Sequence, residues 1–221
     1  MNKVLIVTPH PDDETLGCSG AIQRHKKNGD IVYWLILTEM KVENGWKKAL
    51  IEDRKKEIAK VNEAYSFDKK YELNLSTGSL DQENFSKLIT KIGQIIKSNK
   101  IDIIYTPFIE DIHTDHNIAS KVIAACSKWF RYPSIKKILM YETLSETNFN
   151  FMSTNTFKPN TYFDISKYIK KKIKIFKIYK SENGAHPFPR SIESINSLAL
   201  LRGSESGFNF AEAFILIFNK E

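Results

Sequence analysis

Two hydrophobic patterns alternate along the chain. Short apolar runs rich in β-branched residues predict strands, and the run from Ile31 to Leu37 is apolar throughout, as in a strand covered on both faces. Between these runs, apolar residues recur every three or four positions, as they do from Phe85 to Ile96, and this spacing predicts helices. The predicted strands are 3–8, 30–38, 71–75, 101–105, 137–141, 162–165 and 213–218, and the predicted helices are 15–27, 45–65, 84–98, 117–129, 167–180 and 190–202.

This alternation of strands and helices predicts the fold class. Successive strand–helix–strand units favour right-handed crossovers, so the strands should join in a mainly parallel sheet of the α/β class. At 221 residues the chain suits one domain with a sizeable core. We find no repeat, low-complexity segment or linker, and therefore expect a single domain over 1–221.

The composition bears on where the protein works. The longest apolar runs are too short to cross a bilayer, and the first residues lead directly into a strand without a leader pattern. Cys18 and Cys126 form no zinc-ribbon pattern, so we predict free, partly buried thiols in a reducing compartment. We therefore expect a cytoplasmic protein without stable membrane insertion.

Positive charge is densest in one predicted helix. The formal net charge is +7, which permits attraction to phosphates, nucleic acid or an anionic membrane. In 167–180 the lysines alternate with isoleucine and aromatic residues, a pattern typical of a solvated basic face over an apolar one. Docking of an anionic carrier on this helix is the alternative that the sequence leaves open.

Two loops at predicted strand ends carry the candidate chemistry. The loop 8–14 follows the first strand, and the loop 106–116 follows the fourth. Open α/β sheets bind their ligands at the carboxyl edge, where both loops would lie. The candidate residues are the histidines and aspartates of these loops: His10, Asp12, Asp13, His113, Asp115 and His116.

These residue types indicate a metallohydrolase. Imidazoles and a carboxylate are good zinc ligands, and a catalytic zinc keeps an open position for the water that it activates. A carboxylate that does not bind the metal can accept the proton of that water, and a further histidine can polarise a carbonyl. Taken singly, Asp12 or Asp13 could cap the first helix, and Thr114 or Asp115 could cap the helix after the second loop. Two such loops at two strand ends favour a joint site.

The two loops resemble the signature motifs of a known family. His-Pro-Asp-Asp-Glu at 10–14 and His-Thr-Asp-His at 113–116 are similar to the motifs of the LmbE-like, or PIG-L, zinc-dependent N-acetylglucosamine deacetylases. Arg54 with Glu57 resembles the family's Arg-x-x-Glu, and 211–214 resembles its Ala-Glu-Ala-Phe. The resemblance covers nearly the whole chain and implies a Rossmann-like three-layer fold with a mainly parallel central sheet.

The resemblance also implies the metal ligands. His10, Asp13 and His116 would bind zinc, although ligands of this kind also accept other divalent metals such as Fe²⁺. Glu14 would be structural, because a negative charge is favoured at the start of a helix.

Catalytic and substrate roles are implied in the same way. Asp12 would be the general base that deprotonates the water, and His113 would stabilise the oxyanion and protonate the departing amine. Asp115 would orient an imidazole from behind. Arg54 would reach into the site and bind the sugar or its substituent.

The implied reaction removes an N-acetyl group from an N-acetylated amino sugar or sugar conjugate. Whether that sugar is free, nucleotide-linked or lipid-linked is left open, and a homo-oligomer is one expected state because relatives are often assembled. Thr114 replaces the usual proline of the second motif. Asp111 stands where relatives that act on sugar–inositol substrates often have tyrosine, so that substrate is not expected to transfer. His186 lies in a loop and is either a rim residue of the pocket or a solvated histidine.

Two alternatives remain. The same zinc site could cleave another sugar-linked amide, such as a thiol–sugar conjugate, because the motifs define the reaction and the variable loops define the substrate. A nucleotide-binding or nucleic-acid-binding module is disfavoured, because the first turn lacks Gly-x-Gly-x-x-Gly and its acidic residues would repel phosphate. We therefore expect no nucleic-acid partner.

Overall fold

A seven-stranded sheet forms the centre of the computed structural model, which describes residues 1–152 and 154–220. The strands are β1 (Lys3–Thr8), β2 (Ile31–Glu39), β3 (Lys69–Ser76), β4 (Ile103–Pro107), β5 (Lys137–Tyr141), β6 (Thr161–Asp164) and β7 (Ala211–Asn219). Their order across the sheet is β3-β2-β1-β4-β5-β7-β6. The first five strands are mutually parallel, and β7 is antiparallel to both of its neighbours, so the prediction of a mainly parallel sheet is confirmed.

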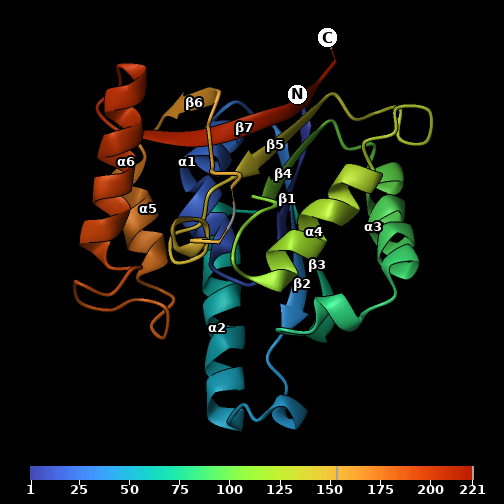
Figure 1. Ribbon diagram of the computed structural model, residues 1–221, viewed down its shortest axis with the longest axis horizontal. Helices are drawn as coiled ribbons and strands as arrows, with labels where there is room; N and C mark the ends of the chain where they lie inside the picture. The colour runs from blue at the N-terminus through green and yellow to red at the C-terminus, as the bar shows by residue number, and fades with distance from the viewer. Residues whose placement is uncertain (153, 221) are drawn as a thin grey trace.

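Helices cover both faces of this sheet, which gives the three layers seen in Figure 1. One face packs against α1, α2, α5 and α6, and the other packs against α3 and α4. The helices are α1 (Asp13–Lys27), α2 (Lys48–Tyr65), α3 (Phe85–Asn99), α4 (Thr114–Ala125), α5 (Ile169–Phe176) and α6 (Ile192–Ser206), with short 3₁₀ turns η1 (Val42–Asn44), η2 (Leu80–Gln82) and η3 (Thr147–Phe149). Among the described residues, no helix is both long and apolar enough to span a membrane.

Strand β1 shows why the central strands are apolar throughout. Val4 and Ile6 join the core under α1, whereas Leu5 and Val7 join the core under α3 and α4. Successive side chains of a strand point to opposite faces, so a strand covered on both faces must be apolar at every position.

The neighbour relation between β1 and β4 brings the two candidate loops together. The two strands pair in parallel, with Val4 opposite Ile103 and Ile6 opposite Tyr105. Parallel strands present their carboxyl ends at one edge of the sheet, so the loops after β1 and β4 leave side by side.

Helix α4 begins earlier than predicted. It starts at Thr114 instead of 117, because the Nδ1 atom of His113 accepts a hydrogen bond from the Asp115 N–H and caps the helix. His116 therefore lies in the first turn of α4 and not in the loop. The residue that caps this helix, His113, is neither of the two considered as caps from the sequence, Thr114 and Asp115.

Other predicted helix boundaries also shift. Helix α5 begins at Ile169, two residues later than predicted, and Tyr168 is its N-cap residue. Ser191 is the N-cap of α6, which extends to Ser206. Cys18 and Cys126 are free, as predicted, and both are buried.

One lysine of the basic helix is buried and anchors α1. The Lys172 Nζ atom lies 2.8 Å from Glu212 Oε1 and donates to the Leu16 carbonyl at 2.7 Å, while Glu212 accepts the N–H groups of Gly20 and Ala21 at 2.9 Å. This pair ties α5 and β7 to the helix that carries the first loop. The remaining lysines of 167–180 form the exposed face that the sequence predicts: Lys167, Lys170, Lys171, Lys174, Lys177 and Lys180.

Removal of the buried lysine should be costly. Lys172→Met leaves the Glu212 carboxylate buried without its counter-charge, and we expect the free energy of unfolding to fall by about 3 kcal/mol. Lys171→Met on the exposed face of the same helix is the matched control and should change it by less than about 0.5 kcal/mol. Urea unfolding of both variants measures the difference, and equal stabilities would contradict the anchoring role.

Candidate active site

A cavity of about 510 Å³ opens at the carboxyl ends of the central strands. The turn after β1, the start of α4 and one side of α2 contribute to its wall. Cavities of this size and mixed polarity are typical of small-molecule sites. Of the predicted site residues, those that line it are His10, Asp12, Asp13, Arg54, His113 and His116. Asp115 is fully buried behind them.

Three of these residues form a group that fits a metal ion. The nitrogen and oxygen atoms of His10, Asp13 and His116 lie within 4.8 Å of one another. Asp13 Oδ1 is 3.3 Å from His116 Nε2, and Asp13 Oδ2 is 3.6 Å from His10 Nδ1. Within the described part of the chain, His116 Nε2 is buried without a hydrogen-bond partner. Buried polar atoms normally have a hydrogen-bond partner, so an imidazole nitrogen that lacks one and faces a carboxylate fits the role of a metal ligand.

Carboxylates behind the two imidazoles fix their orientation. The His116 Nδ1 atom lies 2.8 Å from Asp111 Oδ2, and His10 Nε2 lies 3.0 Å from Asp115 Oδ2. In each histidine, the other ring nitrogen therefore faces Asp13. Metal-binding histidines are commonly oriented in this way by a carboxylate on their second ring nitrogen. The sequence analysis missed this position for Asp111 and treated it only as a substrate-related departure. The sequence did offer a signal for this role, because Asp111 is a carboxylate in the same loop, five residues before the candidate ligand His116.

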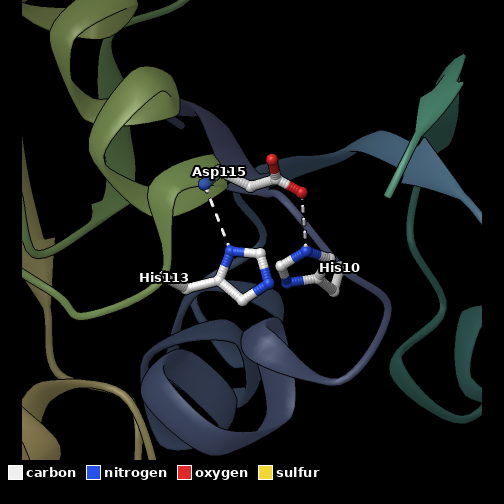
Figure 2. A group of neighbouring side chains, drawn as sticks. All are labelled: His10, His113 and Asp115. Carbon is white, nitrogen blue, oxygen red and sulfur yellow. Dashed lines mark hydrogen bonds and ion pairs between the residues drawn. The ribbon is translucent and has the colours of Figure 1, made fainter. Parts of the chain in front are cut away.

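A second group, made of His10, His113 and Asp115, is also compact enough for a metal, but its atoms are already engaged. Figure 2 shows the Asp115 carboxylate pointing at His10 and the Asp115 N–H pointing at His113. The same carboxylate accepts the N–H groups of Gly78 and Leu80 at 2.7 and 3.0 Å. The group that contains His116 therefore fits a metal better.

Asp12 occupies the turn between β1 and α1 in an unusual conformation. It is the N-cap residue of α1 with φ of 139°, and its carbonyl accepts the N–H groups of Thr15 and Leu16 at 2.9 Å. Its carboxylate makes no capping hydrogen bond to any described residue, so Asp12 is the N-cap by position and its side chain does not cap the helix. The side chain lines the cavity and is only 7% exposed. Burial, and then the charge of Asp13, raise the pKa of Asp12 well above its ordinary value.

The other titratable groups of the site are shifted in different directions. Burial would raise the pKa of Asp13, but the imidazoles of His116 and His10 outweigh burial and lower it to about 2. Burial, followed by the neighbouring His10 and His116, lowers the pKa of His113 to about 4. For His116, the carboxylates of Asp13 and Asp111 outweigh burial and raise the pKa.

Arg54 lines the cavity, but its guanidinium is engaged by the protein. Nη1 donates to the Pro11 carbonyl at 2.7 Å, and Nη2 donates to Ser181 Oγ at 2.8 Å and to the Glu182 carboxylate. Nε lies 3.3 Å from Glu57 Oε2, so the Arg-x-x-Glu pattern forms an ion pair within α2.

A polar wall that the sequence did not predict completes the cavity. Arg190 donates to Ser145 Oγ at 2.7 Å and to Glu182 Oε2 at 2.8 Å, and Ser145 Oγ donates to Glu146 Oε1 at 3.1 Å. All four residues line the cavity. His186 is exposed, and the described part of its loop contributes Glu182 and Arg190 to the lining instead.

Fold and site together define an α/β protein with a candidate His/Asp metal centre at the carboxyl edge of its sheet. Residues 5–127, more than half of the chain, match the PIG-L family, described as GlcNAc-PI de-N-acetylase. The chain therefore belongs to the PIG-L family, which is a family of sugar deacetylases.

Similar proteins include both deacetylases and a different enzyme. Diacetylchitobiose deacetylase of Thermococcus kodakarensis is 22% identical, over 96% of this chain and 82% of that protein. The structure of N,N'-diacetylchitobiose deacetylase from Pyrococcus horikoshii superposes with a TM-score of 0.78 at 20% identity, over 98% of this chain and 84% of that one. GalB of Pseudomonas putida, a 4-carboxy-2-hydroxymuconate hydratase, also reaches 0.78 at 14% identity, over 100% and 98% of the two chains. At these identities the structural likeness shows the fold.

The Asp111 contact predicts an effect on metal binding. Asp111→Asn removes the charge behind His116, and we expect the affinity for a divalent metal to fall about 10-fold to 100-fold. Competition with a chelator measures the affinity. Thr147→Val is the control, because it removes only the hydroxyl that donates to Asp111 Oδ1 at 2.6 Å and should have a smaller effect. An unchanged affinity in Asp111→Asn would contradict the assignment of His116 as a ligand.

Proposed function

We propose that this protein is a zinc-dependent hydrolase that removes the acetyl group from an N-acetylated amino sugar or sugar conjugate. The observation that carries the proposal is the buried Nε2 of His116, which has no hydrogen-bond partner among the described residues and faces Asp13 and His10. The Asp12 carboxylate, which makes no capping hydrogen bond to a described residue, lines the same cavity. Membership of the PIG-L family and the names of the diacetylchitobiose deacetylases support an N-acetylated sugar as the substrate.

The proposed ligands are His10 Nδ1, His116 Nε2 and the Asp13 carboxylate. Zinc held there would polarise the amide carbonyl and lower the pKa of a water beside it. Iron(II) and other divalent metals suit the same ligands, and zinc is our choice because imidazole and carboxylate ligands bind it well.

The remaining residues handle protons and charge. Asp12 accepts the proton of the attacking water, whose oxygen bonds to the carbonyl carbon. His113 Nδ1 accepts the Asp115 N–H, so the neutral ring carries its proton on Nε2 and can donate it in a hydrogen bond to the developing oxyanion. The carbonyl then re-forms as the carbon–nitrogen bond breaks, and the proton held by Asp12 passes to the departing amine. The acetic acid that leaves still carries the second proton of the water and loses it to become acetate.

The cavity wall supports a polyhydroxylated substrate. Glu146, Glu182 and Arg190 offer acceptors and donors for hydroxyl groups in the same cavity as the proposed metal ligands, and Arg54 is proposed to contact the substrate from α2. The alternative, a thiol–sugar amide, would use the same catalytic residues. We place the reaction in the cytoplasm, which the two free cysteines support because thiols stay reduced there.

Mutation should distinguish the roles of the two adjacent aspartates, Asp12 and Asp13. Asp12→Ala should lower the rate of acetate release about 100-fold to 10,000-fold while zinc remains bound, because a general base and not a ligand is lost. Asp13→Ala should lose the zinc as well. Acetate release from a panel of N-acetylated sugars, together with metal analysis of each purified variant, measures both effects.

The zinc content of the two variants decides which aspartate is the ligand and which is the base. Loss of zinc from Asp12→Ala with retention in Asp13→Ala would reverse the two roles. Absence of acetate release by the wild-type protein from every acetylated sugar and thiol–sugar amide would reject the hydrolase proposal, and assay of hydration across a carbon–carbon double bond would then test the chemistry named for the GalB relative.

A further inference from the structure

The peptide unit between Pro11 and Asp12 is held from both sides by two buried side chains, Arg54 of α2 and Glu14 of α1. Arg54 Nη1 donates to the Pro11 carbonyl at 2.7 Å, and the Asp12 N–H donates to Glu14 Oε2 at 3.1 Å. Glu14 is 0% exposed and Arg54 is 7% exposed. The carbonyl and the N–H of one peptide unit are therefore fixed together, and so is the rotation of that unit.

This rotation determines the backbone conformation of Asp12. A φ of 139° lies where residues with a Cβ atom are strained, at a cost of about 1–3 kcal/mol. Relaxation of φ would move either the His10–Pro11 segment or the Cβ atom of Asp12. The first carries a proposed metal ligand and the second carries the proposed base, so their relative placement depends on the strained angle.

We propose that Glu14 is a positioning residue for Asp12. Together with Arg54 it clamps the Pro11–Asp12 peptide in the orientation that directs the Asp12 carboxylate into the cavity. Within the described chain, Glu14 is not part of the cavity lining, so it acts on the reaction through the Pro11–Asp12 peptide and not by contact with a substrate. The inference rests on the proposed function, because it takes Asp12 to be the base.

The carboxylate of Glu14 is itself locked in place. Its Oε1 atom accepts the Tyr179 hydroxyl at 2.8 Å and the Thr15 hydroxyl at 2.6 Å, and the Tyr65 hydroxyl donates to Thr15 Oγ1 at 3.1 Å. With Oε1 anchored to the segment after α5 and to α1, Oε2 is directed at the Asp12 N–H. If Glu14 served only as a negative charge at the start of α1, none of these contacts would be needed.

The clamp predicts a separation of kcat from KM. Glu14→Ala, assayed at saturating zinc, should lower kcat about 10-fold to 100-fold and leave KM unchanged, because a small misplacement of a catalytic group has effects of this size. Glu14→Gln keeps an oxygen that can accept the Asp12 N–H and should restore kcat to within a few-fold of wild type. Tyr105→Phe is the control. It removes the buried hydrogen bond between the Tyr105 hydroxyl and His25 Nε2 at 2.9 Å and touches neither Glu14 nor Asp12, so it should lower stability and leave kcat unchanged.

Each outcome decides for or against the clamp. Should Glu14→Ala not fold, Glu14→Asp withdraws the carboxylate from Asp12 by one methylene and should show the same fall in kcat. A wild-type kcat in either variant, a change in KM alone, or an equal fall in Tyr105→Phe would overturn the proposal.

A structural measurement separates the clamp from the proposed function. In crystals of Glu14→Ala or Glu14→Asp, the φ of Asp12 should leave the positive region, and an unchanged φ would overturn the clamp. If the wild-type protein releases no acetate from any acetylated sugar, the proposed function fails, and the crystallographic φ still decides whether Glu14 holds this peptide.

Discussion

The parallel pairing of β1 with β4 is the constraint on which the site depends. These strands are far apart in the sequence, and their adjacency places the ends of both at one edge of the sheet. His10 and Asp13 follow the end of β1, and His116 lies in the first turn of α4, which follows β4. Since each loop supplies only part of a metal-binding group, neither could form the site without its neighbour.

In the turn after β1, the residues that are strained or buried at a cost in stability are also those proposed to act in the reaction. Asp12 is strained and buried, and its carboxylate is close to that of Asp13. Such a turn persists only when its surroundings over-determine it. Here the surroundings are contacts from α2, from the segment after α5, and from the Lys172–Glu212 pair that anchors α1. Buried polar groups outside the cavity lining, such as Lys172 and Glu212, are thus connected to the geometry inside the cavity.

The fold alone does not choose the chemistry. The same sheet and helices superpose on sugar deacetylases and on a hydratase with equal closeness. What separates such enzymes is the set of side chains at the carboxyl edge and the loops that close over them. In this protein the closing wall is a network of Ser145, Glu182 and Arg190 with Glu146, and this wall is where substrate preference would be determined.

The sequence by itself determined the element types, the parallel sheet and the two loops, because apolar periodicity and clustered histidines and aspartates are local signals. It did not determine what lies behind those residues. Asp111 orients His116, Glu14 contacts the Asp12 backbone, and Arg54 is engaged by Pro11 and Glu182. Each of these contacts needs a particular strand order, helix start or backbone angle. The start of α4 shows the limit well, since an imidazole cap at His113 is not a signal that composition can reveal. Only tertiary structure decides which polar side chain meets which, because hydrogen bonds depend on distances that the chain sets when it folds.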